Sequence, residues 1–145
     1  MIIAVDFDGT ICEHKYPKIG EEKPFATEIL RQLIAERYKV VLWTMRTGDL
    51  LEDAIKWCEE RGVYFYAVNN ENSTLFDEER GPGFSCKLNA DVFIDDRNIG
   101  GLPDWPTIYK MIKENKTYEQ IIRQRVRDEY TVPKPPHPKW MFWKG

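Results

Sequence analysis

The chain has 145 residues, of which 42% are apolar and 31% charged, and its formal net charge is −3. This length suits one compact domain, and this composition excludes a chain that is disordered throughout. No apolar run approaches the roughly 18 residues that cross a bilayer, and no basic segment precedes the apolar N-terminus as it would in a signal peptide. Cys12, Cys58 and Cys86 show no metal-ligand spacing. We therefore expect reduced thiols in a cytoplasmic protein that does not enter a membrane.

The charge is distributed unevenly along the chain. Residues 1–96 contain 11 Lys and Arg against 19 Asp and Glu, whereas residues 97–145 contain 10 against 5. An acidic first part suits a cation site, and a basic second part suits an anionic partner. Solvated charges on helix surfaces would produce the same imbalance, so charge alone does not choose between these interpretations.

Four short β-rich runs are nearly continuous in apolar residues, as in strands buried on both faces of a parallel sheet. They lie at 2–7, 39–44, 63–68 and 91–94. Helical patterns lie between and after these runs, at 25–34, 50–58, 105–114 and 118–128. Strands that alternate with helices of this length form right-handed βαβ units, so the predicted fold class is α/β with a mainly parallel central sheet.

Capping residues mark the ends of two predicted helices. Asp49, with Glu52 three residues later, is the expected N-cap of the second helix, and Gly62 is its expected stop. Thr117 and Gln120 have the spacing of a capping box at the start of the last helix.

The composition changes after residue 130. Residues 131–145 contain four prolines and an aromatic cluster at 140–143, which fit neither a regular helix nor a central strand. We interpret residues 1–130 as one domain and 131–145 as a tail. Its aromatic area is expected to pack on its own domain or to form a homo-oligomer with a second copy, and a disordered tail is the alternative.

Carboxylates follow two of the predicted strands. Asp6 and Asp8 come after the first strand, and Asp95 and Asp96 come after the last. Because the carboxyl ends of parallel strands meet at one edge, we expect these four groups to converge there. Such a cluster repels itself unless it holds a cation, and oxygen ligands without His or Cys favour Mg²⁺.

Other residues at this edge suit a phosphoryl group. Gly9 and Thr10 turn the chain and expose backbone N–H groups that could cradle phosphate oxygens. The Thr44 hydroxyl and the Lys87 ammonium could stabilise the remaining oxygens in a transition state. A solvated loop lysine is the other interpretation of Lys87.

Together these residues resemble the four motifs of the haloacid dehalogenase (HAD) superfamily of phosphohydrolases. The resemblance covers about residues 1–100 and keeps the motifs in their order. Its elements are Asp6-Phe7-Asp8-Gly9-Thr10, Thr44, Lys87 and Asp95-Asp96. It implies a Rossmannoid three-layer sandwich and an enzyme that hydrolyses phosphoric monoesters.

The resemblance also implies a role for each motif residue. Asp6 would be the nucleophile that forms an aspartyl-phosphate, and Asp8 the general acid and then the base. Mg²⁺ would be bound by the Asp6 side chain, the Asp8 backbone carbonyl and Asp95, with Asp96 just outside the ligand set. Thr44 and Lys87 would bind the phosphoryl group.

Arg46 has two interpretations. It lies two residues after Thr44 and resembles the Ser/Thr-x-Arg of polynucleotide-phosphatase members, which implies contact with a phosphate or leaving-group oxygen. A surface salt bridge is the alternative. Cys12 and His14 match no family role and are interpreted as structural.

The intervals that hold cap domains in many HAD enzymes are short here. Residues 12–22 leave room only for a hairpin flap with Pro17 and Gly20 near its tip, and residues 69–86 are too few for a domain. We therefore expect a capless member with an open site.

The leading functional hypothesis is a Mg²⁺-dependent phosphatase of a phosphorylated small molecule. The alternative is a nucleotide or polynucleotide phosphatase, suggested by Arg46, the open site and the basic second half. A third hypothesis is a non-enzymatic HAD-like binding module that acts through its aromatic tail, but the presence of every catalytic residue type argues against it.

Overall fold

The computed structural model of the chain describes residues 1–70 and 87–131. The chain divides into two compact units, Met1–Lys110 and Met111–Gly145. The predicted aromatic cluster at 140–143, and all of the predicted tail except Thr131, lie outside the described residues. None of the described helices has the length and apolar character needed to span a membrane.

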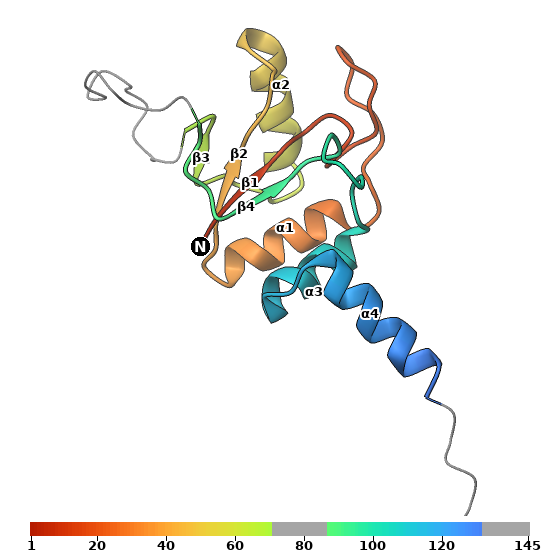
Figure 1. Cartoon of the computed structure of the whole chain (residues 1–145). Helices are drawn as coiled ribbons and strands as arrows, with labels where there is room; N and C mark the ends of the chain where they lie inside the picture. The colour runs from red at the N-terminus through yellow and green to blue at the C-terminus, as the bar shows by residue number, and fades with distance from the viewer. Residues whose placement is uncertain (71–86, 132–145) are drawn as a thin grey trace, which may run out of the picture. The chain divides into compact units, whose positions relative to one another are not determined.

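A parallel sheet forms the centre of the first unit. Within the described residues it has four strands in the order β3-β2-β1-β4, all pointing the same way (Figure 1). The strands are β1 (Ile2–Val5), β2 (Lys39–Leu42), β3 (Ala67–Val68) and β4 (Val92–Ile94). The predicted α/β class and parallel sheet are therefore confirmed. The predicted strand at 63–68 is shorter than expected. Only the last two residues of this run pair with β2, and Tyr64 near its start is exposed.

Both faces of the sheet are buried, as the nearly continuous apolar runs predict. On one face Ala4, Val41 and Ala67 lie in register on neighbouring strands and pack with Leu88. Alternate side chains point to opposite faces of a strand. The other face accordingly carries a second set, and these residues are also buried: Ile3, Val5, Val40 and Leu42.

Helices α1 (Ala26–Ala35) and α2 (Gly48–Glu59) connect the first three strands. Helix α1 begins one residue later than predicted, because Phe25 has a left-handed φ of 66° and is 57% exposed. The predicted N-cap of α2 is wrong: the helix begins at Gly48 with Thr47 as N-cap and no side-chain cap hydrogen bond. Gly62 has a φ of 77° and follows the end of α2, as predicted.

Two further helices follow the sheet. Helix α3 (Trp105–Glu114) spans the boundary between the two units, and α4 (Tyr118–Glu129) lies in the second unit. The predicted capping box is confirmed, since the Gln120 N–H donates to Thr117 Oγ1 and the Thr117 N–H donates to Gln120 Oε1.

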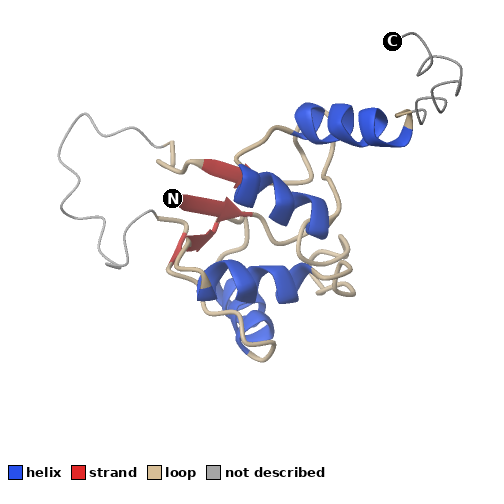
Figure 2. Cartoon of the chain, turned by 90° about the horizontal axis from the view of Figure 1, so that it is seen from below, coloured by secondary structure: helices blue, strands red, loops and turns tan. Residues whose placement is uncertain are grey.

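The segment between β1 and α1 consists of loops and turns (Figure 2). Its base is a short antiparallel hairpin, as predicted: the Glu13 N–H donates to the Glu21 carbonyl, and Cys12 pairs with Glu22. Gly20 is required here, because a Cβ at this position would meet the Glu13 backbone. Backbone hydrogen bonds therefore hold the two ends of the flap at 12–22 together.

Two thiols of the described chain are buried in the first unit. Cys12 and Cys58 are unbridged, and burial raises the pKa of both, to about 12 for Cys58. Thiols of this kind are unreactive, in agreement with the structural interpretation of Cys12.

Candidate active site

The loops after β1, β2 and β4 meet at the carboxyl edge of the sheet, where they line a cavity of about 800 Å³. Five of the predicted site residues line it: Asp6, Asp8, Thr44, Arg46 and Asp95. Six residues that were not predicted as site residues complete the lining: His14, Tyr16, Trp43, Met45, Asn69 and Arg97. The topology alone brings these loops together, because parallel strands present their carboxyl ends on the same side.

A cluster of three carboxylates forms part of this edge. Oxygens of Asp6, Asp95 and Asp96 all lie within 4.8 Å of one another. These groups come from opposite ends of the first unit's sequence and meet because β1 and β4 are neighbours. Three of the four carboxylates that were predicted to converge therefore do so, whereas the carboxylate of Asp8 is not part of this group and pairs with Arg46.

The Thr10 hydroxyl links two members of the cluster. It lies 3.1 Å from Asp6 Oδ2 and 3.2 Å from Asp96 Oδ1, and it accepts a hydrogen bond of 3.1 Å from the Asp96 N–H. Thr10 is fully buried, and its carbonyl accepts a hydrogen bond of 3.1 Å from Trp105 Nε1. Because a hydroxyl has one hydrogen, Thr10 donates to only one carboxylate at a time.

The cluster changes the protonation of the expected nucleophile. Burial raises the pKa of Asp6 to about 7, and the negative charges of Asp95 and Asp96 add to the effect of burial. Hydrogen bonds from the Phe7 N–H and the Thr10 hydroxyl oppose it. A cation among these carboxylates would favour the charged form of Asp6.

Gly9 has a structural role that differs from the predicted phosphate contact. Its φ is 83°, and a Cβ here would lie 2.5 Å from Asp96 Oδ2. The Gly9 N–H donates to the Cys12 carbonyl at 2.8 Å, and the Thr10 N–H is 3.2 Å from the Phe7 carbonyl. These two N–H groups close the turn, so the expectation that they cradle a phosphate is not met. Glycine is needed because it allows Asp96 to approach the backbone.

Thr44 is oriented by a residue that the sequence reasoning missed. The Asn69 Oδ1 accepts a hydrogen bond of 2.8 Å from the Thr44 N–H, while Thr44 Oγ1 accepts one of 3.1 Å from the Arg46 N–H. The hydroxyl hydrogen of Thr44 is thus left to donate toward the cavity. Asn69 directly follows β3 and was detectable by the rule that located the aspartates.

Arg46 is neither a phosphate ligand nor part of a surface salt bridge in this structure. It is 1% exposed, and Nε and Nη2 each donate to one oxygen of Asp8 at 2.7 Å. Its remaining N–H groups donate to three backbone carbonyls, those of Pro17, Lys18 and Leu50. A guanidinium has five N–H donors, so none is left for a phosphate oxygen. The pKa of Arg46 is raised by the hydrogen bonds to Asp8.

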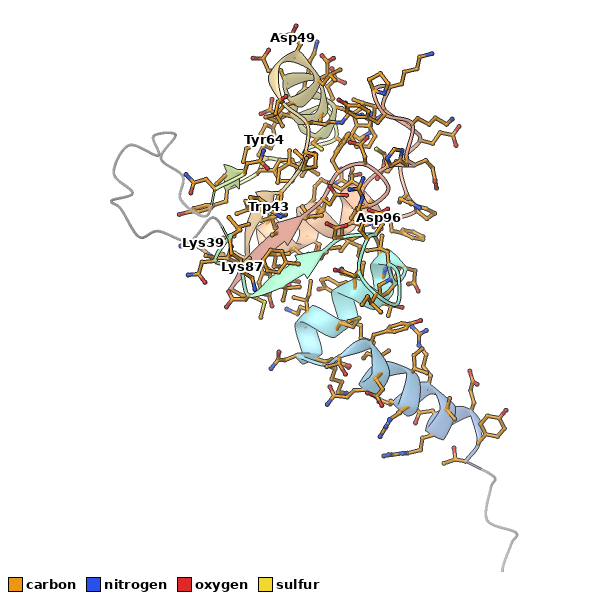
Figure 3. The ribbon with its side chains drawn as sticks, turned by 45° about the horizontal axis from the view of Figure 1, so that its top comes forward. Lys39, Trp43, Asp49, Tyr64, Lys87 and Asp96 are labelled. Atoms are coloured by element: carbon orange, nitrogen blue, oxygen red, sulfur yellow. The ribbon has the colours of Figure 1, made fainter. Side chains whose placement is uncertain are left out.

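Lys87 lies away from the cavity. It is exposed, it is absent from the cavity lining, and it precedes β4 by five positions. Figure 3 shows it toward the end of the sheet where Lys39 begins β2, opposite the end that carries Asp96. The structure therefore does not bring Lys87 to the other predicted site residues.

Apart from Met45, the remaining lining residues are aromatic or basic. His14 and Tyr16 extend from the flap, Trp43 follows β2, and Arg97 follows the Asp95-Asp96 pair. His14 is exposed and lines the cavity, which differs from its interpretation as a structural residue. The flap residues carried no sequence signal, because their place depends on how the hairpin folds back.

The parallel sheet and the carboxylate cluster at its edge define an α/β protein with a candidate cation-binding active site. No known protein-family profile matches the chain, and no curated protein shows significant similarity to it. A solved structure, of a conserved protein coded by a locus from Bacteroides thetaiotaomicron, is 57% identical with a TM-score of 0.76, covering 83% of this chain and 96% of that chain. The chain belongs to the family of this conserved protein.

Proposed function

We propose that the protein is a Mg²⁺-dependent phosphatase of the HAD type, which hydrolyses a phosphate monoester through an aspartyl-phosphate on Asp6. The observation that carries the proposal is the meeting of Asp6, Asp95 and Asp96 within 4.8 Å beside the cavity. The Thr44 hydroxyl lines the same cavity from the neighbouring strand. This edge would thus provide a nucleophile, ligands for a cation, and a hydroxyl that donates a hydrogen bond to the phosphoryl group.

The donor set fits Mg²⁺. The cluster offers only carboxylate oxygens, which magnesium prefers over nitrogen or sulfur ligands. Asp6 and Asp95 would hold the ion together with the Asp8 backbone carbonyl, and Asp96 would be oriented by Thr10 beside them. When bound, the ion would supply charge neutralisation for the phosphoryl oxygens.

Asp6 and Asp8 would divide the chemistry. An Asp6 oxygen attacks phosphorus, the bond to the ester oxygen breaks, and Asp8 gives a proton to the departing oxygen. A water then attacks the aspartyl-phosphate, Asp8 takes the proton of that water, and the P–O bond to Asp6 breaks to release phosphate. Asp8 can accept the proton of the water while paired with Arg46, because each carboxylate oxygen has a second lone pair. The proton that Asp8 gives in the first step must occupy one of these lone pairs before the ester bond breaks.

A nucleotide is the second candidate substrate. Arg46 no longer supports it, since its donors are all used within the protein. Tyr16 and Trp43 do support it, because both line the cavity and a nucleobase stacks on such rings. A cavity of about 800 Å³ lies within the range of small-ligand sites.

The test is phosphate release by the full chain from a panel of sugar phosphates, nucleoside monophosphates and p-nitrophenyl phosphate, with Mg²⁺ or EDTA. We expect release that requires Mg²⁺ and that Asp6→Asn abolishes, because uncatalysed hydrolysis is negligible. Asp53→Asn, an exposed aspartate of α2, is the matched control and should retain the activity. Turnover by Asp6→Asn at the wild-type rate, or none by the wild type on the whole panel, would contradict the proposal.

A further inference from the structure

A phosphoryl group at the proposed site would bring its own negative charge next to three carboxylates. Even with a divalent cation, such a site needs basic donors directed at the phosphoryl oxygens. The sequence suggested two of them, Arg46 and Lys87. The structure uses every donor of Arg46 within the protein and leaves Lys87 outside the cavity lining.

Arg97 has the properties that these two residues lack. It lines the cavity together with Asp6, Asp8 and Thr44, and its side chain is exposed. Its guanidinium forms no ion pair or hydrogen bond with any residue that the structure describes, so its five donors are available. The other arginine that lines this cavity, Arg46, has every donor occupied within the protein.

Hydrogen bonds hold the backbone around Arg97, whereas its side chain is exposed. The Arg97 N–H donates to Asp95 Oδ1 at 2.8 Å, and the Asn98 side chain donates to the Asp95 carbonyl at 2.8 Å. This turn directly follows β4 and holds Arg97 next to the carboxylate cluster. An anchored backbone with an unpaired guanidinium is suited to an incoming anion, and the planar fork of arginine matches phosphate oxygens in pairs.

We propose that Arg97, and not Lys87, is the positively charged side chain that binds the phosphoryl group of the substrate at this site. The inference rests on the proposed function for its substrate. It assigns a binding role to a residue outside the motifs that the resemblance uses, and it removes that role from Lys87.

The test compares Arg97→Gln, Lys87→Gln and Lys56→Gln, where Lys56 is an exposed residue of α2 and serves as the surface control. The binding of inorganic phosphate in the presence of Mg²⁺ is measured by calorimetry, and kcat/KM is measured on any ester that the wild type hydrolyses. We expect Arg97→Gln to weaken phosphate binding about 10- to 100-fold, as for loss of charged hydrogen bonds, and kcat/KM to fall with it. Arg97→Lys should restore part of the loss, since it keeps the charge but not the fork.

The two proposals fail in different ways. Phosphate binding that depends on Arg97 in a wild type without turnover would overturn hydrolysis but support this inference. Equal phosphate affinity in Arg97→Gln and the wild type, a larger loss in Lys87→Gln, or no phosphate binding by the wild type would each overturn it. Thermal unfolding of each variant separates a binding defect from a folding defect, because the unpaired Arg97 side chain contributes little to stability.

Discussion

Arg46 and Asp8 form a largely buried ion pair with two parallel hydrogen bonds, Nε to Oδ2 and Nη2 to Oδ1, each of 2.7 Å. The side chain of Arg46 is 1% exposed and that of Asp8 is 13% exposed. The guanidinium also lies 5.2 Å from the centroid of the Phe7 ring and 5.3 Å from that of Tyr16. Through its bonds to the Pro17 and Lys18 carbonyls, this pair connects the proposed acid to the flap.

Replacing Arg46 by Met should lower the free energy of unfolding by about 3–5 kcal/mol, because Asp8 and the flap carbonyls lose their donors. Urea unfolding measures the change. Asp8→Asn combined with Arg46→Met should cost less than the sum of the two single changes, since no unpaired charge remains. Lys23→Met, which breaks the more exposed pair with Glu13, is the control and should cost about 0–1 kcal/mol. An equal loss of unfolding free energy in Arg46→Met and Lys23→Met would contradict this account.

Asp6 should make stability depend on pH. Its pKa in the folded protein is about 7, against an ordinary value of 3.8, so the folded state binds more protons than the unfolded state between these values. The free energy of unfolding should therefore fall as the pH rises from about 4 to about 7 without a divalent cation. Asp6→Asn should remove this slope, which thermal unfolding across this range can measure.

A divalent cation should offset the loss of stability that the ionisation of Asp6 causes as the pH rises. Because the ion binds the charged cluster, Mg²⁺ should raise the melting temperature more at about pH 8 than at about pH 5. The same titration on Asp95→Asn should show a smaller rise at the higher pH. If Mg²⁺ stabilised the protein equally at both values, the carboxylates would not be its ligands.

Thr10→Val should loosen the carboxylate cluster. The change keeps the shape but removes the hydroxyl that accepts from the Asp96 N–H and contacts Asp6 and Asp96. Loss of partners for buried polar groups costs about 1–3 kcal/mol, and weaker Mg²⁺ binding should accompany it. Thr10→Ser retains the hydroxyl and should retain the metal affinity even though it loses a methyl group. A Ser variant as weak in Mg²⁺ binding as the Val variant would show that packing, not the hydroxyl, matters.

Gly9→Ala should be more damaging than Gly48→Ala. Both glycines have positive φ, 83° and 55°, so both changes strain the backbone by about 1 kcal/mol or more. At Gly48 nothing lies within 4 Å of an added Cβ, whereas at Gly9 the Asp96 carboxylate lies 2.5 Å away. Only Gly9→Ala should therefore weaken Mg²⁺ binding as well as stability. Calorimetry of Mg²⁺ binding to the two variants tests this difference, and equal affinities would remove the role assigned to Gly9.

Much of the fold and part of the site could be predicted from local sequence. The apolar runs at 2–7 and 39–44 predict buried parallel strands, because a strand covered on both faces has no polar side to alternate. Once the strands are parallel, the residues that follow them must share one edge, which brings Asp6 to Asp95 and Asp96. The boundaries of helices were less predictable. Thr47 is the N-cap of α2 because its carbonyl accepts a hydrogen bond from the Leu51 N–H, and its side chain makes no cap hydrogen bond.

Local pattern and chain direction were enough to predict the α/β class, the parallel sheet, the hairpin base of the flap and the meeting of three carboxylates. The partners of the long basic side chains, in contrast, could be identified only from the folded structure. Arg46 reaches Asp8, 38 positions away, and the flap carbonyls, while Lys87 stays outside the cavity and Arg97 lines it. An arginine or lysine can extend in many directions, and its partner depends on which acceptors the folded loops place within reach.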